Sequence, residues 1–214
     1  MFERDYLMRM IEQAAQALAR ILTRKKSGTA EEVLEEISVS GRSLVGFEPD
    51  VALMLPDEEL QRLATVSGTV DWPRLAFLAR LLCEQAEIHA AAAKPELALP
   101  RWRKGLAIFA GVLAHNSGPD LLRAHGEALA RAAASLVHEA LGPRDALLLA
   151  RYFEATGELG RAEDQLYPWI EADEADARAH ARGFYERLLA KSDAELERGN
   201  LPRDEVEEGL ARLS

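Results

Sequence analysis

The sequence has a single cysteine, Cys83, so the chain can form neither an internal disulfide nor a metal site built from several cysteines. Cys83 ends the apolar run 78–83, where a small buried side chain is a better explanation than a reactive thiol. The 14 glycines are scattered singly and form neither a P-loop nor a dinucleotide-binding motif. The Gly-x-Ser-x-Gly elbow of serine hydrolases is also missing. The chain therefore lacks the commonest enzyme motifs.

Long apolar runs and an excess of positive charge are missing too. No apolar stretch approaches the roughly 18–20 residues that a membrane span requires. Near the N-terminus Glu3, Asp5 and Glu12 argue against a transit peptide. With 36 acidic and 26 basic residues the net charge is −10, which repels phosphate backbones. We therefore expect a soluble, cytoplasmic protein that binds neither nucleic acid nor a membrane.

Histidine ligand pairs are also lacking. None of the five histidines lies three residues from a glutamate, and no two are four residues apart. The Glu-x-x-His and His-x-x-x-His elements of metal sites are thus absent. A cryptic metal protein or enzyme would need His115, His125 and His138 to converge through helix packing. We expect no enzyme activity, no catalytic residue, no metal and no cofactor.

What the sequence does contain is the 3.6-residue apolar period of α-helices along most of its length. Thr29 and Glu32 form a capping box, and Asp71 with Pro73 opens a long helix. No segment alternates in the manner of a strand, so we expect an all-α fold of nine or ten helices without a sheet. The predicted helices are one closing at 24–26, one opening at 29, then 57–68, 71–93, 95–116, 120–141, 144–156, 159–170, 176–198 and 202–213, and residues 46–56 are a connection with room for one short helix.

Three stretches share a spacing that is typical of a tight helical hairpin, and they begin at Gly28, Ala93 and Gly157. Two antiparallel helices approach closely only where a small side chain leaves room, and a bulky residue one turn later fills the next groove. After the second and third starts, a small, a bulky and another small or apolar residue follow at 5, 9 and 12 residues: Ala98, Trp102 and Gly105, and Ala162, Leu166 and Trp169. Gly28, followed by Val33 and Ile37, is a weaker case.

This pattern resembles the tetratricopeptide-repeat hairpin, and it covers residues 10–45, 79–110 and 143–174. The small positions 33, 98 and 162 are 65 and 64 residues apart, about twice the 33–34-residue period of such arrays. Several helices exceed the family length, and Ala93 and Val33 replace preferred residues. The whole sequence is also similar to an uncharacterised bacterial family that carries a domain-of-unknown-function label.

The resemblance implies antiparallel helical hairpins stacked as a tetratricopeptide-like right-handed superhelix. The chain would then be one α-helical repeat domain, 1–214, or N-terminal helices 1–68 followed by an array over 69–214. In the resembled family the first helix of each hairpin lines a concave groove. The matching charged positions in this chain, our candidate binding residues, are Arg80, Glu87, Arg144, Arg151 and Glu154.

These groove positions depart from the family in one respect. Some members hold a peptide's terminal carboxylate with a Lys/Asn clamp, and here Cys83 with Glu87, and Leu147 with Arg151, stand at those positions. The sequence therefore does not support binding of chaperone tails. Arg144 and Arg151 remain able to pair with acidic side chains of a ligand.

Two further clusters have a plain structural interpretation beside a functional one. Glu84 and Glu87, one turn apart, are either a carboxylate pair or, as we expect, part of a solvated helix face. Trp102, among Arg101, Arg103 and Lys104, could stack on a nucleobase, but its place in the repeat favours a packing role. The basic run at 24–26 suits the negative end of a helix dipole.

The sequence leaves two functions open. The leading hypothesis is a non-catalytic helical-repeat module that binds a protein or peptide partner in its groove, or self-associates. The alternative is a regulatory sensor whose groove takes a small ligand or a signalling peptide. Fold alone does not establish either function.

Overall fold

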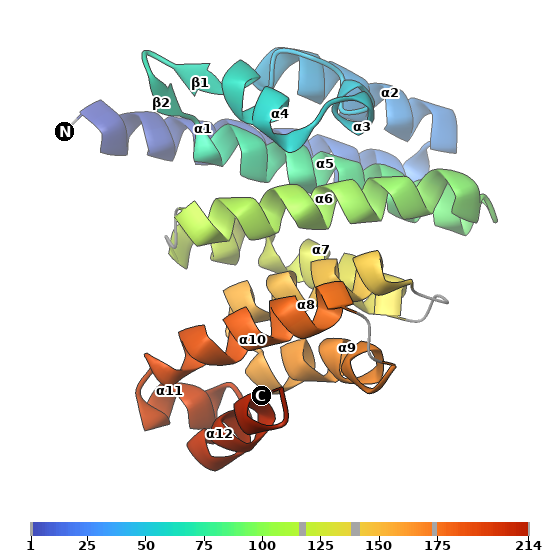
Figure 1. Ribbon diagram of the computed structural model, residues 1–214. Helices are drawn as coiled ribbons and strands as arrows, with labels where there is room; N and C mark the ends of the chain where they lie inside the picture. The colour runs from blue at the N-terminus through green and yellow to red at the C-terminus, as the bar shows by residue number, and fades with distance from the viewer. Residues whose placement is uncertain (1, 116–118, 138–141, 173–174, 214) are drawn as a thin grey trace. The chain divides into compact units, whose positions relative to one another are not determined.

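The computed structural model describes residues 2–115, 119–137, 142–172 and 175–213 (Figure 1). These residues are almost entirely helical, with twelve helices and two strands of two residues each. The chain divides into two compact units, Met1–His138 and Glu139–Ser214. None of the described helices combines the length and the apolar character that crossing a lipid bilayer requires. The prediction of an all-helical protein is confirmed in this form, while its arrangement into domains stays a prediction.

The first unit holds seven helices and a small hairpin. Their bounds are α1 Phe2–Ser27, α2 Ala30–Leu44, α3 Val51–Met54, α4 Asp57–Leu63, β1 Thr65–Val66, β2 Thr69–Val70, α5 Trp72–Ala91, α6 Pro95–His115 and α7 Pro119–Val137. Helix α5 is central: it packs along α6 and also contacts α1, α2 and α7 (Figure 1). All its residues from Leu75 to Ala86 are buried. A helix enclosed in this way must be apolar or must pair each polar group that it carries.

The second unit holds five helices: α8 Pro143–Thr156, α9 Leu159–Glu171, α10 Ala175–Leu189, α11 Asp193–Arg198 and α12 Arg203–Ala211. Helices α8 and α9 form an antiparallel hairpin, and α10 packs on α9 while also touching α8 (Figure 1). Helix α12 covers α10. The core side chains Leu149, Phe153, Leu166, Phe184 and Leu188 are nearly inaccessible to solvent.

Two of the three expected hairpin turns are built alike. Ala93 and Gly157 have left-handed φ angles of 55° and 82°. The next residue in each case donates its backbone N–H to a carbonyl five residues back, from Lys94 to His89 and from Glu158 to Phe153. This is the Schellman closure of a helix C-terminus. Gly28 differs, because its N–H is bonded to the Arg24 carbonyl and the predicted capping box at Thr29 starts α2 at once.

The small positions of the repeat lie at close helix contacts, as the spacing predicts. Val33, Ala98 and Ala162 are all buried. Gly105 is the tightest point between α5 and α6: a Cβ atom there would lie 2.8 Å from the Cys83 sulfur and 2.9 Å from the Ala79 carbonyl oxygen. The sequence pattern therefore marks where the helix axes approach.

The prediction that the chain has no sheet is wrong at one place. Thr65 pairs with Val70 and Val66 with Thr69 in a four-residue antiparallel ladder. Ser67 and Gly68 have φ angles of 52° and 84°, the pair of left-handed residues that a tight hairpin turn needs. Strands of two residues are too short to show an alternating pattern in the sequence. Because β1 begins at Thr65, the helix predicted over 57–68 ends early, at Leu63.

The single helix predicted over 176–198 is also wrong. Helix α10 ends at Leu189 and α11 begins at Asp193. The restart is a capping box, in which Ser192 and Glu195 bond each other's backbone N–H groups. This signal is visible in the sequence but is masked by the uninterrupted apolar period. Together with the short helix α3, the break brings the count to twelve helices among the described residues.

Gly105→Ala is expected to lower the free energy of unfolding by about 2 kcal/mol, because the new methyl group meets the α5 backbone. Gly111→Ala, in the same helix, is the matched control, since no atom lies within 4 Å of its Cβ position. The control should gain up to about 1 kcal/mol from helix propensity. Urea unfolding curves measure both changes, and equal effects of the two substitutions would contradict the close approach.

Candidate functional site

Two groups of charged side chains, one in each unit, are considered as candidate sites, because one is largely buried and the other borders the cavity that contains two of the predicted binding residues. In the first unit they form a buried cluster on α5, which we call the α5 cluster: Lys25, Arg80, Glu84, Glu87 and Arg131. In the second unit they border an open cavity between α8 and α10. Each place has to be assessed for the chemistry that it allows.

Glu84 is the centre of the α5 cluster. Its side chain is fully buried and accepts hydrogen bonds from Lys25 Nζ at 2.5 Å and from Arg80 Nε at 2.7 Å. Glu87, one turn later, accepts from the same Lys25 at 2.8 Å and from Arg131 Nε at 3.1 Å. Two carboxylates thus meet three cations that come from α1, α5 and α7. The expected solvated face is wrong for Glu84, because α1 and α7 cover that side of α5.

The cluster changes the acidity of its members. Burial alone would lower the pKa of Lys25, but the hydrogen bonds to Glu84 and Glu87 raise it above its ordinary value. Burial alone would raise the pKa of Glu87, but Lys25 and Arg131 hold it below its ordinary value. Lys25 and Glu87 therefore stay charged at neutral pH. Because each carboxylate of the cluster already accepts hydrogen bonds from two cations, the cluster indicates a structural role and not acid–base chemistry.

Two other titratable groups near the α5 cluster are unreactive for a related reason. Burial raises the pKa of the Cys83 thiol well above its ordinary value, so the interpretation of Cys83 as a buried small side chain holds. His125 is also buried, with its ring edge-on to Phe109. Burial, helped by the positive charge of Arg80, lowers the pKa of His125 to about 4. His125 is therefore neutral under ordinary conditions.

The hypothesis of a histidine metal site finds no local support in the part of the chain that the structure describes. His115 is exposed and stacks on Trp72 with ring centroids 4.8 Å apart. His138 lies outside the described residues. Among the described side chains, no group of three His, Cys, Asp or Glu could hold a metal ion.

Trp102 has the packing role that its place in the repeat predicts. It is buried, and two of its basic neighbours are taken up by ion pairs with the segment before and within α4. Arg101 bonds Asp50 at 2.9 Å, and Lys104 bonds Asp57 at 2.6 Å. The indole is therefore closed to a stacking base.

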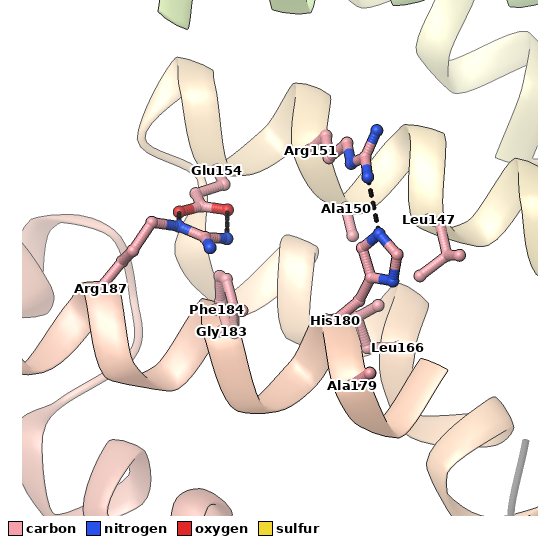
Figure 2. Close-up of a pocket in the computed structure, with 10 residues that line it drawn as sticks. All are labelled: Leu147, Ala150, Arg151, Glu154, Leu166, Ala179, His180, Gly183, Phe184 and Arg187. Carbon is pink, nitrogen blue, oxygen red and sulfur yellow. Dashed lines mark hydrogen bonds and ion pairs between the residues drawn. The ribbon is translucent and has the colours of Figure 1, made fainter. Parts of the chain in front are cut away.

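The cavity of the second unit has a volume of about 440 Å³ and is open to solvent (Figure 2). It lies between the facing sides of α8 and α10, and Leu166 of α9 also lines it. Its lining comes from positions one helical turn apart, which share a face of each helix. The lining residues are Leu147, Ala150, Arg151 and Glu154 of α8, Leu166 of α9, and Ala179, His180, Gly183, Phe184 and Arg187 of α10.

The charged side chains of this cavity form two pairs, one at each end (Figure 2). Arg187 donates to both oxygens of Glu154, from Nε at 2.7 Å and from Nη2 at 2.8 Å. These hydrogen bonds raise the pKa of Arg187. At the other end Arg151 Nη2 lies 2.6 Å from His180 Nε2. Because a guanidinium can only donate, Nε2 is the acceptor and carries no proton in this contact.

The structure distributes the five candidate binding residues among different environments. Arg151 and Glu154 line the same cavity. Arg144 is exposed in the first turn of α8 and is not part of the cavity lining. Arg80 and Glu87 belong to the α5 cluster, where Arg80 is buried against Glu84 and lines no open groove.

Sequence reasoning missed His180 and Arg187. They lie seven residues apart on α10 and therefore share a face with Gly183. That spacing was available in the sequence. What it could not indicate is that this face of α10 meets α8, because the contact joins residues about 30 positions apart.

One known protein family matches the chain. The model of a family of unknown function, DUF6483, matches residues 1–214. The chain belongs to this family. No curated protein and no solved structure matches the chain. The family thus covers both units and brings no activity, so function must be argued from the two charged sites.

Glu84→Gln should reduce the free energy of unfolding by an amount on the order of 3 kcal/mol, because it leaves Arg80 and Lys25 buried with less opposing charge. Glu127→Gln is the control: Glu127 also pairs with Arg131, but its side chain is 90% exposed. Its loss should cost less than about 0.5 kcal/mol. Chemical denaturation distinguishes the two, and a small effect at Glu84 would mean that the cluster does not hold the helices.

Stability should also fall between pH 6.5 and pH 4 because of His125. Its pKa drops from 6.5 in the unfolded chain to about 4 in the fold, so the unfolded chain binds the proton first as the pH falls. The loss is about 3 kcal/mol over this window. His125→Phe should remove this part of the pH dependence, whereas His115→Phe, at an exposed site, should keep it. The test is to measure the free energy of unfolding at several pH values. If this free energy falls with pH equally in His125→Phe and the wild type, the prediction is wrong.

Proposed function

We propose that the protein is a non-catalytic helical-repeat module that binds a peptide, or an exposed segment of another protein, in the groove between α8 and α10. The observation that supports this most is the form of the groove: an open cavity of about 440 Å³ with an apolar floor and charged ends. Leu147, Leu166 and Phe184 supply the floor. Apolar contacts at the centre and polar groups at the rim are typical of peptide-binding surfaces.

Helix order in both units is consistent with the tetratricopeptide resemblance. Helices α8 and α9 form a hairpin and the next helix, α10, lies against both. Helices α5 and α6 repeat this relation with α7, and so do α1 and α2 with α5. In such arrays the first helices of successive hairpins face the ligand, and α8 and α10 hold those positions here. The right-handed superhelix itself stays a part of this proposal.

A sensor that takes a small ligand is the second candidate, because the cavity volume falls within the range of small-molecule sites. Such sites usually enclose most of the ligand surface. This cavity is open to solvent, which suits a chain that continues beyond it. We therefore place the peptide function first.

Filling the groove tests this function. Ala179 is an exposed lining residue, so Ala179→Trp places a large ring in the groove without entering the core. Ala155→Trp is the matched control, at an exposed alanine of α8 outside the lining. Affinity purification from the source cells, read by mass spectrometry, should recover a partner with the wild type and with the control. Ala179→Trp should reduce its recovery at least about tenfold.

Two results would contradict the proposal. A partner that binds Ala179→Trp as well as the wild type does not use this groove. A small molecule retained by the wild type, lost in Ala179→Trp and accompanied by no protein would favour the sensor.

A further inference from the structure

We infer that the groove between α8 and α10 recognises acidic peptide segments, with Arg151 as the residue that receives a carboxylate of the ligand. This inference rests on the proposed function and adds the chemistry of the partner. It follows from how the charges of the cavity are matched, from the charge of the whole unit and from the apolar floor.

The cavity contains one more cation than its carboxylates can neutralise. The charge of Arg187 is matched by Glu154, because its two hydrogen bonds use both oxygens of that carboxylate. Among the described residues Arg151 bonds His180 of α10, with Nη2 at 2.6 Å from Nε2, while both oxygens of Glu154, the carboxylate one turn along α8, are bonded to Arg187. An imidazole brings no negative charge, so the guanidinium keeps its full positive charge. An anion is therefore the complement of this end of the groove.

The second unit has a negative net charge, so a cation that is not paired with a carboxylate stands out there. Residues 139–214 contain 18 Asp and Glu against 10 Lys and Arg, so cations in this unit have many carboxylates within reach. Arg161, Arg203 and Arg212, for example, are each paired with an acid. Arg151, beside a cavity, is paired with an imidazole instead.

The geometry suits a carboxylate. The guanidinium fork binds both oxygens of a carboxylate side by side, and such charge-assisted bonds are roughly twice as strong as bonds to neutral acceptors. A carboxylate would therefore replace the imidazole nitrogen as the acceptor of Arg151. Figure 2 shows Arg151 directed toward His180 with Leu147 near them, so a carboxylate bound to Arg151 would lie next to an apolar side chain.

A phosphate group fits the same charges less well. It carries up to two negative charges, and Glu154 borders the same cavity within an acidic unit, so a dianion meets more repulsion than a carboxylate does. The floor formed by Leu147, Leu166 and Phe184 calls for an apolar side chain next to the acid. The ligand that matches both features is a peptide in which acidic and apolar residues are neighbours.

Two capped hexapeptides provide the probe: one has a single Glu flanked by two Leu residues, with Ser at the other positions, and the other has Gln in place of that Glu. Fluorescence anisotropy with the whole protein measures both dissociation constants. The Glu peptide should bind at least about tenfold more tightly than the Gln peptide. Arg151→Gln should reduce this preference to about one. Arg144→Gln is the control, because Arg144 is exposed on the same helix outside the lining and its loss removes the same charge.

The outcomes separate this inference from the proposed function. If both peptides bind with equal affinity and Ala179→Trp abolishes binding, the groove binds peptides and the inference is overturned. If Arg144→Gln weakens the Glu peptide as much as Arg151→Gln does, general charge attraction explains the preference and the inference is again overturned. If neither peptide binds and the amide NMR signals of α8 and α10 do not move, the inference and the proposed function both fail.

Competition distinguishes the two kinds of anion. Acetate and inorganic phosphate are added separately to the complex with the Glu peptide, at equal ionic strength. Acetate should displace the peptide at a lower concentration than phosphate does. The reverse order would show that the site prefers phosphate and would overturn the assignment to a carboxylate.

Discussion

The enclosure of α5 is the constraint on which the first unit depends. Four helices surround it, so a charged group between Leu75 and Ala86 is stable only with a partner inside the protein. Glu84 meets this demand with Lys25 from α1 and Arg80 from its own helix, while Glu87 adds Arg131 from α7. A buried charge tolerates few alternative positions, because a shift of one helix leaves it without a partner. The cluster therefore sets how α1 and α7 sit on α5.

Close contact between α5 and α6 is the apolar counterpart of this constraint. Gly105 lets the Cys83 sulfur and the Ala79 backbone come within van der Waals distance. Both units also place a small residue five positions after a left-handed turn, and these residues, Ala98 in α6 and Ala162 in α9, are fully buried. Both units thus use one packing rule, and in both the turn is closed by a Schellman bond. The repeated spacing in the sequence is the trace of this rule.

The two charged sites differ in a way that bears on function. In the α5 cluster three cations face two carboxylates, and Glu84 at its centre is fully buried, so the charges serve the fold. In the cavity between α8 and α10, Arg151 faces an imidazole and the groove is open to solvent. Matched and buried charges hold helices together, whereas an open cation without a carboxylate beside it is available to a partner. This contrast is why the binding proposal concerns the second unit.

The sequence by itself determined the helical class, most helix limits and the small residues at the helix contacts, because caps and apolar periods act within a few residues. It also contained Arg151 and Glu154 as candidates. Only the tertiary structure decided that Arg80 and Glu84 are buried, that His180 and Arg187 complete the cavity and that Arg144 stays outside it. Each of these depends on which helix covers which face, and that choice joins residues tens of positions apart. Local periodicity carries no record of such pairings.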